Sequence, residues 1–218
     1  MEQIPDRQAI SRRMKSHYEA VWQAGDAWSL EASRYEQIRY DFQVEMLATR
    51  RYASILEIGC GSGCLTRRLA TISDRVLALD ISPAAIERAR AQVTSIADSG
   101  SIELRAADIM DVDVAAEGPW DLVVFSETIY CLGWLYPMFD VALLAANLRA
   151  AMLPGGRLLL SNTYGADRDW LLRPWLIDTY RDLFRNVGFE LEREDVFCGI
   201  KDEVEMRVLT SLFTVCGA

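Results

Sequence analysis

The sequence is poor in the residues that build metal centres and in positive charge. It has one histidine, His17, and five cysteines without a C-x-x-C pair, which argues against a zinc site and favours reduced, buried thiols. Acidic residues outnumber basic ones by 32 to 23, for a net charge of −9. Because phosphate contacts need a basic surface, this balance argues against a nucleic-acid partner.

Long apolar segments are also missing. No run approaches the roughly 20 residues of a membrane-spanning helix, and residues 1–15 lack the apolar segment of a signal peptide. We therefore expect a cytoplasmic protein without a membrane partner. Its 218 residues, 51% of them hydrophobic, suit one α/β domain, and no repeat or linker divides 1–218.

The sequence does contain a predicted strand that runs into a glycine-rich loop and then a helix. Residues 53–58 form the strand, Gly59, Gly61 and Gly63 the loop, and Cys64 begins the helix. Glycines let the main chain approach a ligand, and the helix N-terminus turns unpaired N–H groups toward it. Cys64 takes the place of the last glycine in a dinucleotide fingerprint, so an oxidoreductase is the weakest alternative.

Glu57 precedes this loop by two residues. A carboxylate there would repel a pyrophosphate but suits a ligand with an ammonium group. S-adenosylmethionine (SAM) carries an ammonium and a sulfonium and has no phosphate. The glycine loop and Glu57 together therefore favour SAM over NAD.

Two further acids follow predicted strands. Asp80 ends the strand 75–80, where a carboxylate can accept hydrogen bonds from a ribose diol, and Ile81 after it can lie against the adenine. Asp108, followed by Ile109, comes directly after the strand 101–107. It can accept from the adenine amine or instead cap the turn at 109–111.

A near-continuous apolar strand, 121–126, is typical of a central strand covered on both faces. Ser126 and Glu127 lie at its carboxyl end, which faces the ligand crevice of such sheets. Further strands are predicted at 157–162, 188–193 and 203–215, the last two as an antiparallel hairpin. Helices are predicted from Ser82-Pro83 to 97, from 136 or 139 to 152, and over 175–186.

Helical patterns dominate residues 1–50. Asp6 can cap a helix through Ala24, and a second helix is predicted from residue 30 or 31 to 49. Helices before such a sheet often cover the crevice as a lid. Trp28 and Tyr35 serve equally well as lid residues or as packing onto the sheet, whereas packing is favoured for Trp22.

The glycine loop with Glu57, Asp80, Asp108 and the strand from Asp121 together resemble the class I SAM-dependent methyltransferases. The resemblance implies an α/β, Rossmann-like, seven-stranded sheet of order 3-2-1-4-5-7-6 with strand 7 antiparallel and helices on both faces. It also implies a helical lid over 1–50, a core over 51–218, and S-adenosylhomocysteine (SAH) as product.

A narrower resemblance is to the NodS-like subfamily, whose namesake N-methylates a chitooligosaccharide precursor of nodulation signals. It rests on residues 26–28, 35–36, 39–40, 56–60 and 127–132. It implies that Arg34 or Arg39 pairs with the methionine carboxylate. The cofactor-binding residues then predicted are Trp28, Tyr35, Arg39, Glu57, Gly59, Gly61, Gly63, Asp80, Ile81, Asp108, Ile109 and Ser126.

The predicted reaction is methyl transfer to an amine or hydroxyl of a small molecule or sugar-derived substrate. An amine acceptor needs only to arrive neutral, whereas a hydroxyl needs a base. Glu127 is the first candidate, as base or as positioning residue, and His17 is the second. Acceptor-pocket residues are predicted to be Tyr130, Trp134, Tyr164 and Trp170.

Two other SAM-based functions stay open. One is an enzyme that breaks a different sulfonium bond, for example a cyclase that forms azetidine-2-carboxylate and methylthioadenosine. The other is a SAM-binding module without catalysis. The sequence favours neither a monomer nor a homodimer.

Overall fold

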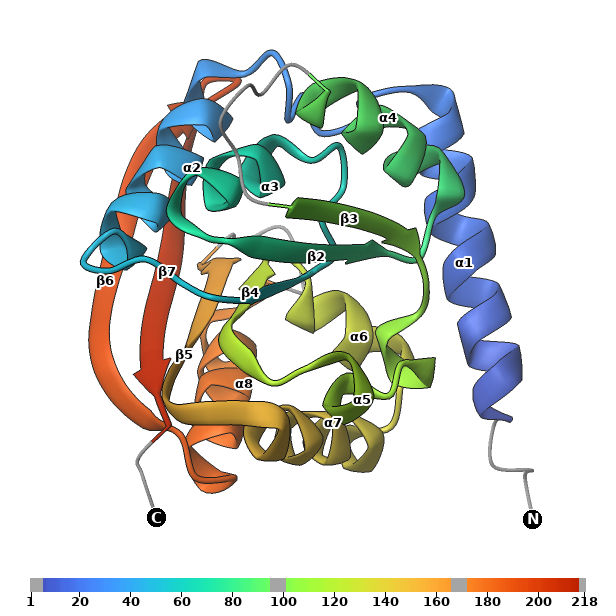
Figure 1. Cartoon of the computed structure of the whole chain (residues 1–218). Coiled ribbons are helices and arrows are strands. Elements are labelled where there is room, and N and C mark those ends of the chain that lie inside the picture. Colours follow the sequence, from blue (N-terminus) through green and yellow to red (C-terminus); the bar gives the residue numbers. More distant parts are fainter. Residues whose placement is uncertain (1–5, 95–100, 166–171, 216–218) are drawn as a thin grey trace.

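The computed structural model describes residues 6–94, 101–165 and 172–215 (Figure 1). Its sheet has the order β3-β2-β1-β4-β5-β7-β6, with β7 antiparallel to both neighbours and the other adjacent pairs parallel. The predicted strand order and the antiparallel strand 7 are thus confirmed. The strands are β1 Ile55–Ile58, β2 Arg75–Asp80, β3 Ser101–Ala106, β4 Trp120–Ser126, β5 Met152–Thr163, β6 Glu190–Lys201 and β7 Val204–Thr214.

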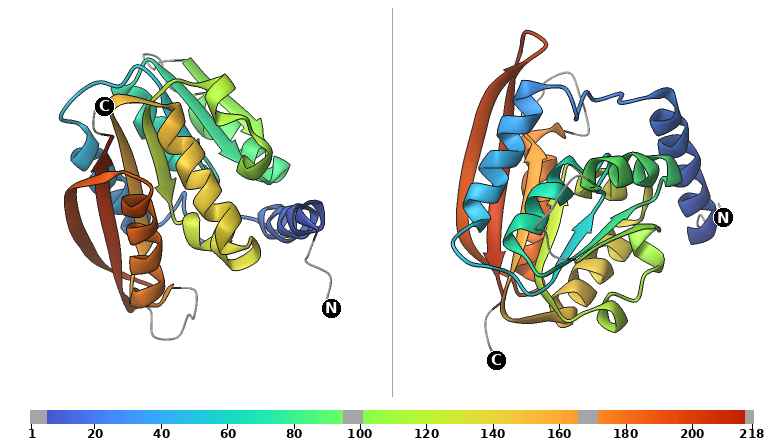
Figure 2. Two further views of the ribbon diagram at one scale, coloured as in Figure 1. Left: turned by 90° about the horizontal axis from the view of Figure 1, so that it is seen from below. Right: turned by 45° about the horizontal axis from the view of Figure 1, so that its top comes forward.

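Helices lie on both faces of the sheet, as predicted (Figure 2). One face packs against α2, α3 and α4, and the opposite face against α6, α7 and α8, with apolar residues of α1 joining that second core. The helices are α1 Arg7–Ala24, α2 Arg34–Leu47, α3 Cys64–Leu69, α4 Pro83–Val93, α5 Val114–Glu117, α6 Ile129–Leu135, α7 Met138–Ala151 and α8 Pro174–Asn186, with 3₁₀ turns η1 Ala70–Ile72 and η2 Ile109–Asp111.

The central strand β4 explains this layering. Leu122 and Val124 point into the core beneath α2 and α3, whereas Val123 and Phe125 point into the core beneath α7 and α8. All four side chains are fully buried. A strand covered on both faces has no polar alternation, which is why this segment reads as a continuous apolar run.

The second N-terminal helix begins later than predicted. Both carboxylate oxygens of Asp26 accept backbone N–H bonds, from Leu30 (2.9 Å) and Glu31 (2.9 Å). These bonds stabilise a turn before the helix, because an Asp side chain can satisfy nearby backbone donors in place of a helical ladder. Residues 30–33 therefore form a connection, and α2 begins at Arg34.

Helix α6 was not predicted, and the sequence gives a physical reason for the miss. It contains Gly133, a poor helix former. A Cβ at that position would lie 1.6 Å from the hydroxyl of Tyr180 on α8. The glycine is thus required by packing between α6 and α8, although it disfavours the helix itself.

Of the cysteines, Cys60 and Cys64 are buried and Cys131 is half-buried, but Cys198 is exposed. The prediction of buried thiols is therefore wrong for Cys198. Cys216 lies outside the described residues. Within the described ranges, no helix combines the length and apolar character needed to cross a bilayer.

Candidate functional site

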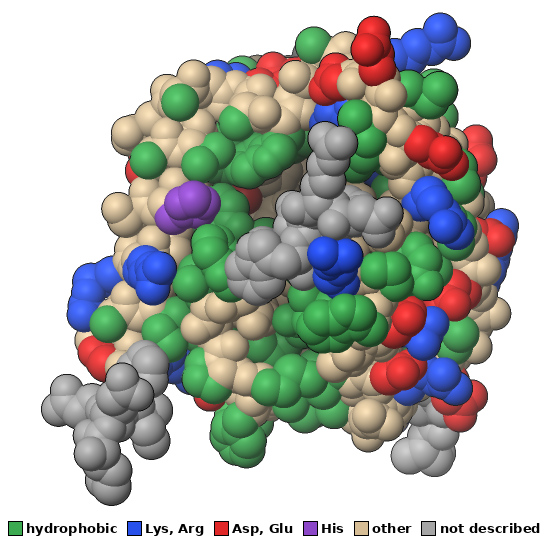
Figure 3. Space-filling model, turned by 180° about the vertical axis from the view of Figure 1, so that it is seen from behind, with side chains coloured by type: hydrophobic (Ala, Val, Ile, Leu, Met, Phe, Trp, Pro, Cys, Tyr) green, Lys and Arg blue, Asp and Glu red, His purple; other side chains and the backbone are tan. Residues whose placement is uncertain are grey.

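A cavity of about 450 Å³ opens at the carboxyl ends of β1, β2 and β4. Figure 3 shows the surface hollowed beside His17. Helices α1 and α2 supply further walls, and Figure 1 shows α1 beside the carboxyl ends of β2 and β3. The predicted site residues that line the cavity are His17, Trp28, Tyr35, Arg39, Glu57, Gly59, Gly61, Asp80, Ile81, Asp108, Ile109, Ser126, Glu127, Tyr130 and Trp134.

The glycine loop forms the floor of the cavity. Gly59 has φ +77° and Gly61 φ +54°, a region that favours glycine. A Cβ on Gly59 would lie 2.3 Å from Thr128 Oγ1, and one on Gly61 would lie 3.0 Å from the ring of Trp22. Both backbone conformation and close neighbours therefore demand glycine at these two positions.

Gly63 has a different role from its two neighbours. It precedes α3 as the N-cap, and a Cβ there would lie 2.9 Å from Ala89 of α4. It is not among the residues that line the cavity. The third glycine therefore serves helix packing.

Asp80 ends β2 with its carboxylate held by backbone groups. Gly61 N donates to Oδ2 (3.0 Å) and Ser82 N donates to Oδ1 (2.9 Å). Each carboxylate oxygen accepts two hydrogen bonds, so each keeps capacity for a ligand hydroxyl. Burial raises the pKa of Asp80 to about 6, because the charged form loses solvation.

Glu57 on β1 is 3% exposed. Its Oε2 accepts from Thr66 Oγ1 of α3 (2.6 Å). Burial raises its pKa to about 8. A ligand cation beside this carboxylate would favour its charged form.

Both carboxylate oxygens of Asp108 accept hydrogen bonds from other groups of the protein. Its Oδ1 accepts from Met110 N (3.0 Å), which confirms the alternative that Asp108 caps the turn at 109–111. Its Oδ2 accepts from Ser11 Oγ of α1 (2.6 Å) and from the Tyr136 hydroxyl. Asp108 thereby fastens α1 to the end of β3.

A second contact fastens α1 beside Asp80. Glu19 of α1 accepts from Ser82 Oγ (2.5 Å) and Ala84 N (3.1 Å), at the N-terminus of α4. Hydrogen bonding to these donors lowers the pKa of Glu19, consistent with a carboxylate at a helix N-terminus. The lid helix therefore contacts the ends of both β2 and β3.

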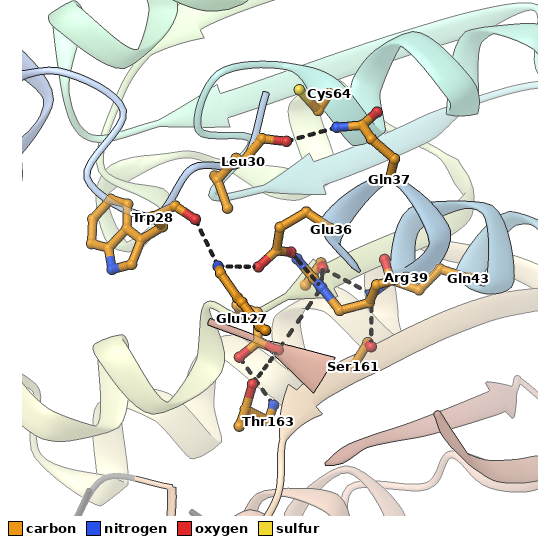
Figure 4. A network of polar contacts seen from close by, with 12 residues as sticks. Trp28, Leu30, Glu36, Gln37, Arg39, Gln43, Cys64, Glu127, Ser161 and Thr163 are labelled. Atoms are coloured by element: carbon orange, nitrogen blue, oxygen red, sulfur yellow. Dashed lines mark hydrogen bonds and ion pairs between the residues drawn. The ribbon is translucent and has the colours of Figure 1, made fainter. Parts of the chain in front are cut away.

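Glu127, just beyond β4, holds the strand tip together. It has φ +57°. Its carboxylate accepts from Thr163 N (3.0 Å), Thr163 Oγ1 (2.9 Å) and the Tyr130 hydroxyl (3.2 Å), and lies 3.8 Å from Arg39 Nη1. Burial raises the pKa of Glu127, an effect opposed by Arg39 and Thr163. Figure 4 shows Glu127 between Arg39 and Thr163.

The network continues from Glu127 into the lid. Arg39, 3% exposed, donates to Glu36 Oε2 through Nε (2.8 Å), pairs with the same atom through Nη2 (2.7 Å), and donates to Ser126 Oγ (3.0 Å). Glu36 also accepts from Lys201 Nζ (2.5 Å) at the end of β6. The charges thus alternate in sign from Lys201 at the end of β6, through Glu36 and Arg39 on α2, to Glu127. Figure 4 shows the path from Glu36 to Glu127.

Aromatic rings line the mouth of the cavity. Trp28 and Trp134 are 40% and 39% exposed, and His17 meets Trp134 edge to face at 6.0 Å between centroids. Trp28 contacts Trp22 in the same geometry at 5.4 Å. Tyr35 is buried, and its hydroxyl has no hydrogen-bond partner among the described residues.

Three residues singled out in the sequence lie elsewhere. Tyr164 is not among the lining residues, and its ring instead packs against the Arg207 guanidinium, 5.8 Å from the centroid. Arg34 is exposed on α2 and does not line the cavity, so of the two candidate arginines only Arg39 lines it. Trp170 lies outside the described residues.

Several lining residues were missed, among them Tyr18, Thr128, Lys201 and Met206. Trp22 also lines the cavity, although its 4% exposure agrees with the predicted packing role. Thr128 follows the candidate Glu127, so proximity in sequence was a usable signal. Lys201 carried none, because only the folded hairpin brings it to the lid.

These residues fit a SAM-like ligand on the evidence of the cavity itself. Asp80 keeps acceptor capacity for a diol, and the backbone of Gly59 and Gly61 lines the cavity beside it. Glu57 supplies a carboxylate for an ammonium group, and exposed aromatic faces suit a sulfonium. The volume lies within the range of small-molecule sites.

Comparisons with known proteins agree with this geometry. The family model described as Nodulation protein S (NodS) matches residues 13–179. The chain is 29% identical to Nodulation protein S of Rhizobium tropici over 70% of this chain, but spans 59% of that protein. It is 29% identical to Nodulation protein S of Bradyrhizobium diazoefficiens over 82% of each chain.

A solved structure shows the same fold. It is the N-methyltransferase NodS from Bradyrhizobium japonicum WM9 in complex with SAH, with a TM-score of 0.75 and 23% identity over 93% of this chain and 98% of that one. The family model covers well over half of the chain. The chain therefore belongs to the NodS family, within the class I SAM-dependent methyltransferases.

Proposed function

We propose that the protein transfers the methyl group of SAM to an amine of a sugar-derived small molecule. The observation that supports this most is the shape of the site. One cavity joins a glycine loop and a strand-end diol acceptor, Asp80, to a second polar cluster around Glu127 and an aromatic mouth. Family membership supports nitrogen as the acceptor atom, because the solved NodS relative is an N-methyltransferase.

We assign the cofactor contacts residue by residue. Asp80 would accept from the ribose hydroxyls, Glu57 would face the ammonium, and Arg39 would offer its remaining N–H donor capacity to the methionine carboxylate. SAM itself supplies an electrophilic methyl group on its sulfonium. The protein then has to hold donor and acceptor in line, a contribution worth about 7 kcal/mol or more.

Glu127 is assigned a positioning role rather than that of a general base. Its carboxylate accepts three hydrogen bonds and lies beside Arg39, so its lone pairs are largely occupied. An amine acceptor that arrives neutral needs no base at this point. His17 is exposed at the mouth, against Trp134, and is assigned to the rim.

The mouth suits a sugar ring attached to the amine. Trp28 and Trp134 offer partly exposed aromatic faces there, which can stack on the apolar face of a pyranose. Tyr130 lies deeper, with its hydroxyl on Glu127. The acceptor amine would then lie between the tryptophan rings at the mouth and the Tyr130 hydroxyl.

The test is incubation with SAM and a chitin-derived oligosaccharide that carries one free amine, with the fully N-acetylated oligomer as matched control. We expect SAH and a product heavier by one methylene from the amine alone. Methylation of phenols instead would move the proposal to oxygen acceptors. Methylthioadenosine without any acceptor would support the cyclase or lyase alternative, and SAH binding without turnover would support a binding module.

A further inference from the structure

The β6–β7 hairpin packs along α2 through every second residue of β6. The Phe197 ring lies 5.5 Å from those of Tyr35 and Phe42. Gly199 leaves room for Tyr35, whose ring carbon would lie 2.9 Å from a Cβ at that position. Since side chains alternate along a strand, Lys201 follows on the same face and ends the row.

The Lys201 ammonium makes two contacts with the lid. Its Nζ donates to the Trp28 carbonyl oxygen (2.7 Å) and to Glu36 Oε1 (2.5 Å). Its side chain is 17% exposed and that of Glu36 6% exposed. A charge-assisted pair in so little solvent is stronger and less screened than a surface ion pair.

Each contact leads to a different part of the cavity. From Trp28, the path runs through the Trp22 ring, which covers Gly61 of the glycine loop. From Glu36, it runs through Arg39 to Ser126 and Glu127 at the end of β4. One ammonium group therefore joins the cofactor loop and the strand tip.

We propose that Lys201 is a positioning residue of the cofactor pocket, holding residues 28–36 over the crevice. The family model ends at residue 179, so Lys201 and the hairpin lie outside the part of the chain it matches. Without Lys201, the buried Glu36 would draw Arg39 toward itself and away from Glu127. The proposal concerns SAM binding and does not depend on which acceptor is methylated.

The test is calorimetric titration of the whole chain with SAH, without any acceptor. Lys201→Met keeps the aliphatic stem and removes both contacts, and we expect about tenfold weaker SAH binding, the size of one lost charge-assisted hydrogen bond. Ile200→Thr is the matched control, because Ile200 is 72% exposed. It should bind SAH like the unchanged protein.

Hydrogen exchange of the SAH-free protein separates positioning from general stability. In Lys201→Met, amides of residues 28–36 should exchange faster while those of β1, β2 and β4 keep their protection. Glu36→Gln combined with Lys201→Met should weaken SAH binding no more than the larger single change, because both act along one path.

Two results would overturn the proposal. One is wild-type SAH affinity in Lys201→Met. The other is faster exchange spread evenly over the sheet, which would mean that Lys201 stabilises the fold rather than the lid. Because no acceptor is present, either result leaves the proposed N-methylation untouched.

Discussion

Two carboxylates at the ends of β2 and β4, the strands on either side of β1, are held in opposite ways. Asp80, at the end of β2, is oriented by the backbone N–H groups of Gly61 and Ser82. Glu127, at the end of β4, is oriented by Arg39, Tyr130 and Thr163, contributed by α2, α6 and β5. The backbone-built half of the pocket depends on local sequence, whereas the half built from side chains depends on the whole fold.

The largest expected effect tests the backbone-built half. Asp80→Ala should weaken SAH binding by at least tenfold, because it removes both acceptors for the ribose diol and a single charge-assisted bond is worth about 1.5–3 kcal/mol. Calorimetry measures this. Asp74→Ala is the control, since it removes an exposed ion pair at the other end of the same strand. Unchanged affinity in Asp80→Ala would refute the placing of the ribose.

Glu127→Gln tests the half built from side chains. The amide cannot accept all of the hydrogen bonds that now reach the carboxylate, so we expect turnover to fall about tenfold with SAH affinity nearly unchanged. Single-turnover rates and calorimetry separate the two quantities. Equal losses in both would show that Glu127 belongs to the cofactor contacts instead.

The pH dependence of SAH binding sharpens the contrast. The pKa of Asp80 is about 6 in the free protein, and a protonated carboxyl accepts less well, so affinity should fall as pH drops through about 6. The contribution of Asp80 to the stability of the ligand-free fold changes in the opposite direction. It rises as the pH falls through about 6, because a carboxyl pKa that is raised in the folded state favours the protonated form. Titrations between pH 5 and 7 should show the fall near pH 6, and Asp80→Asn should remove it while leaving the contribution of Glu57, whose pKa burial raises to about 8.

The smallest effect concerns the attachment of α1. Ser11→Ala removes one of three donors to Asp108 and should lower the free energy of unfolding by about 0.5–1.5 kcal/mol, with little change in SAH affinity. Denaturant unfolding measures it, and Ser16→Ala, an exposed residue on the same helix, serves as control. A large loss of affinity would place Asp108 among the ligand contacts after all.

The sheet, and the position of Glu57 and Asp80 at the cavity, could be predicted because each depends on a short stretch of chain. The glycine loop, Asp80 and the apolar strand β4 can each be recognised from a few consecutive residues, and the pattern of apolar residues predicts the strands. The start of α2 was predicted too early because the side-chain bonds of Asp26 stabilise a turn where the pattern suggested a helix. Helix α6 was missed because Gly133 disfavours a helix, and the contact with Tyr180 that requires this glycine is far away in the sequence.

The rest of the site needed contacts between residues far apart in the chain. Lys201 meets Glu36 across 165 residues, and Ser11 meets Asp108 across 97. No spacing in the sequence encodes such pairs. Tyr164 shows the converse, because its place after β5 suggested the pocket, yet its ring packs on Arg207.

The order in which the strands are made has a consequence for synthesis on the ribosome. β7 is the last strand along the described chain, yet it lies between β5 and β6. A nascent chain can pair β1 to β5 early, but β6 has no neighbour until residues 204–214 emerge and insert. The wall that carries Lys201 is therefore completed only after β7 has been made, later than the strands β1, β2 and β4 whose ends form the rest of the cavity.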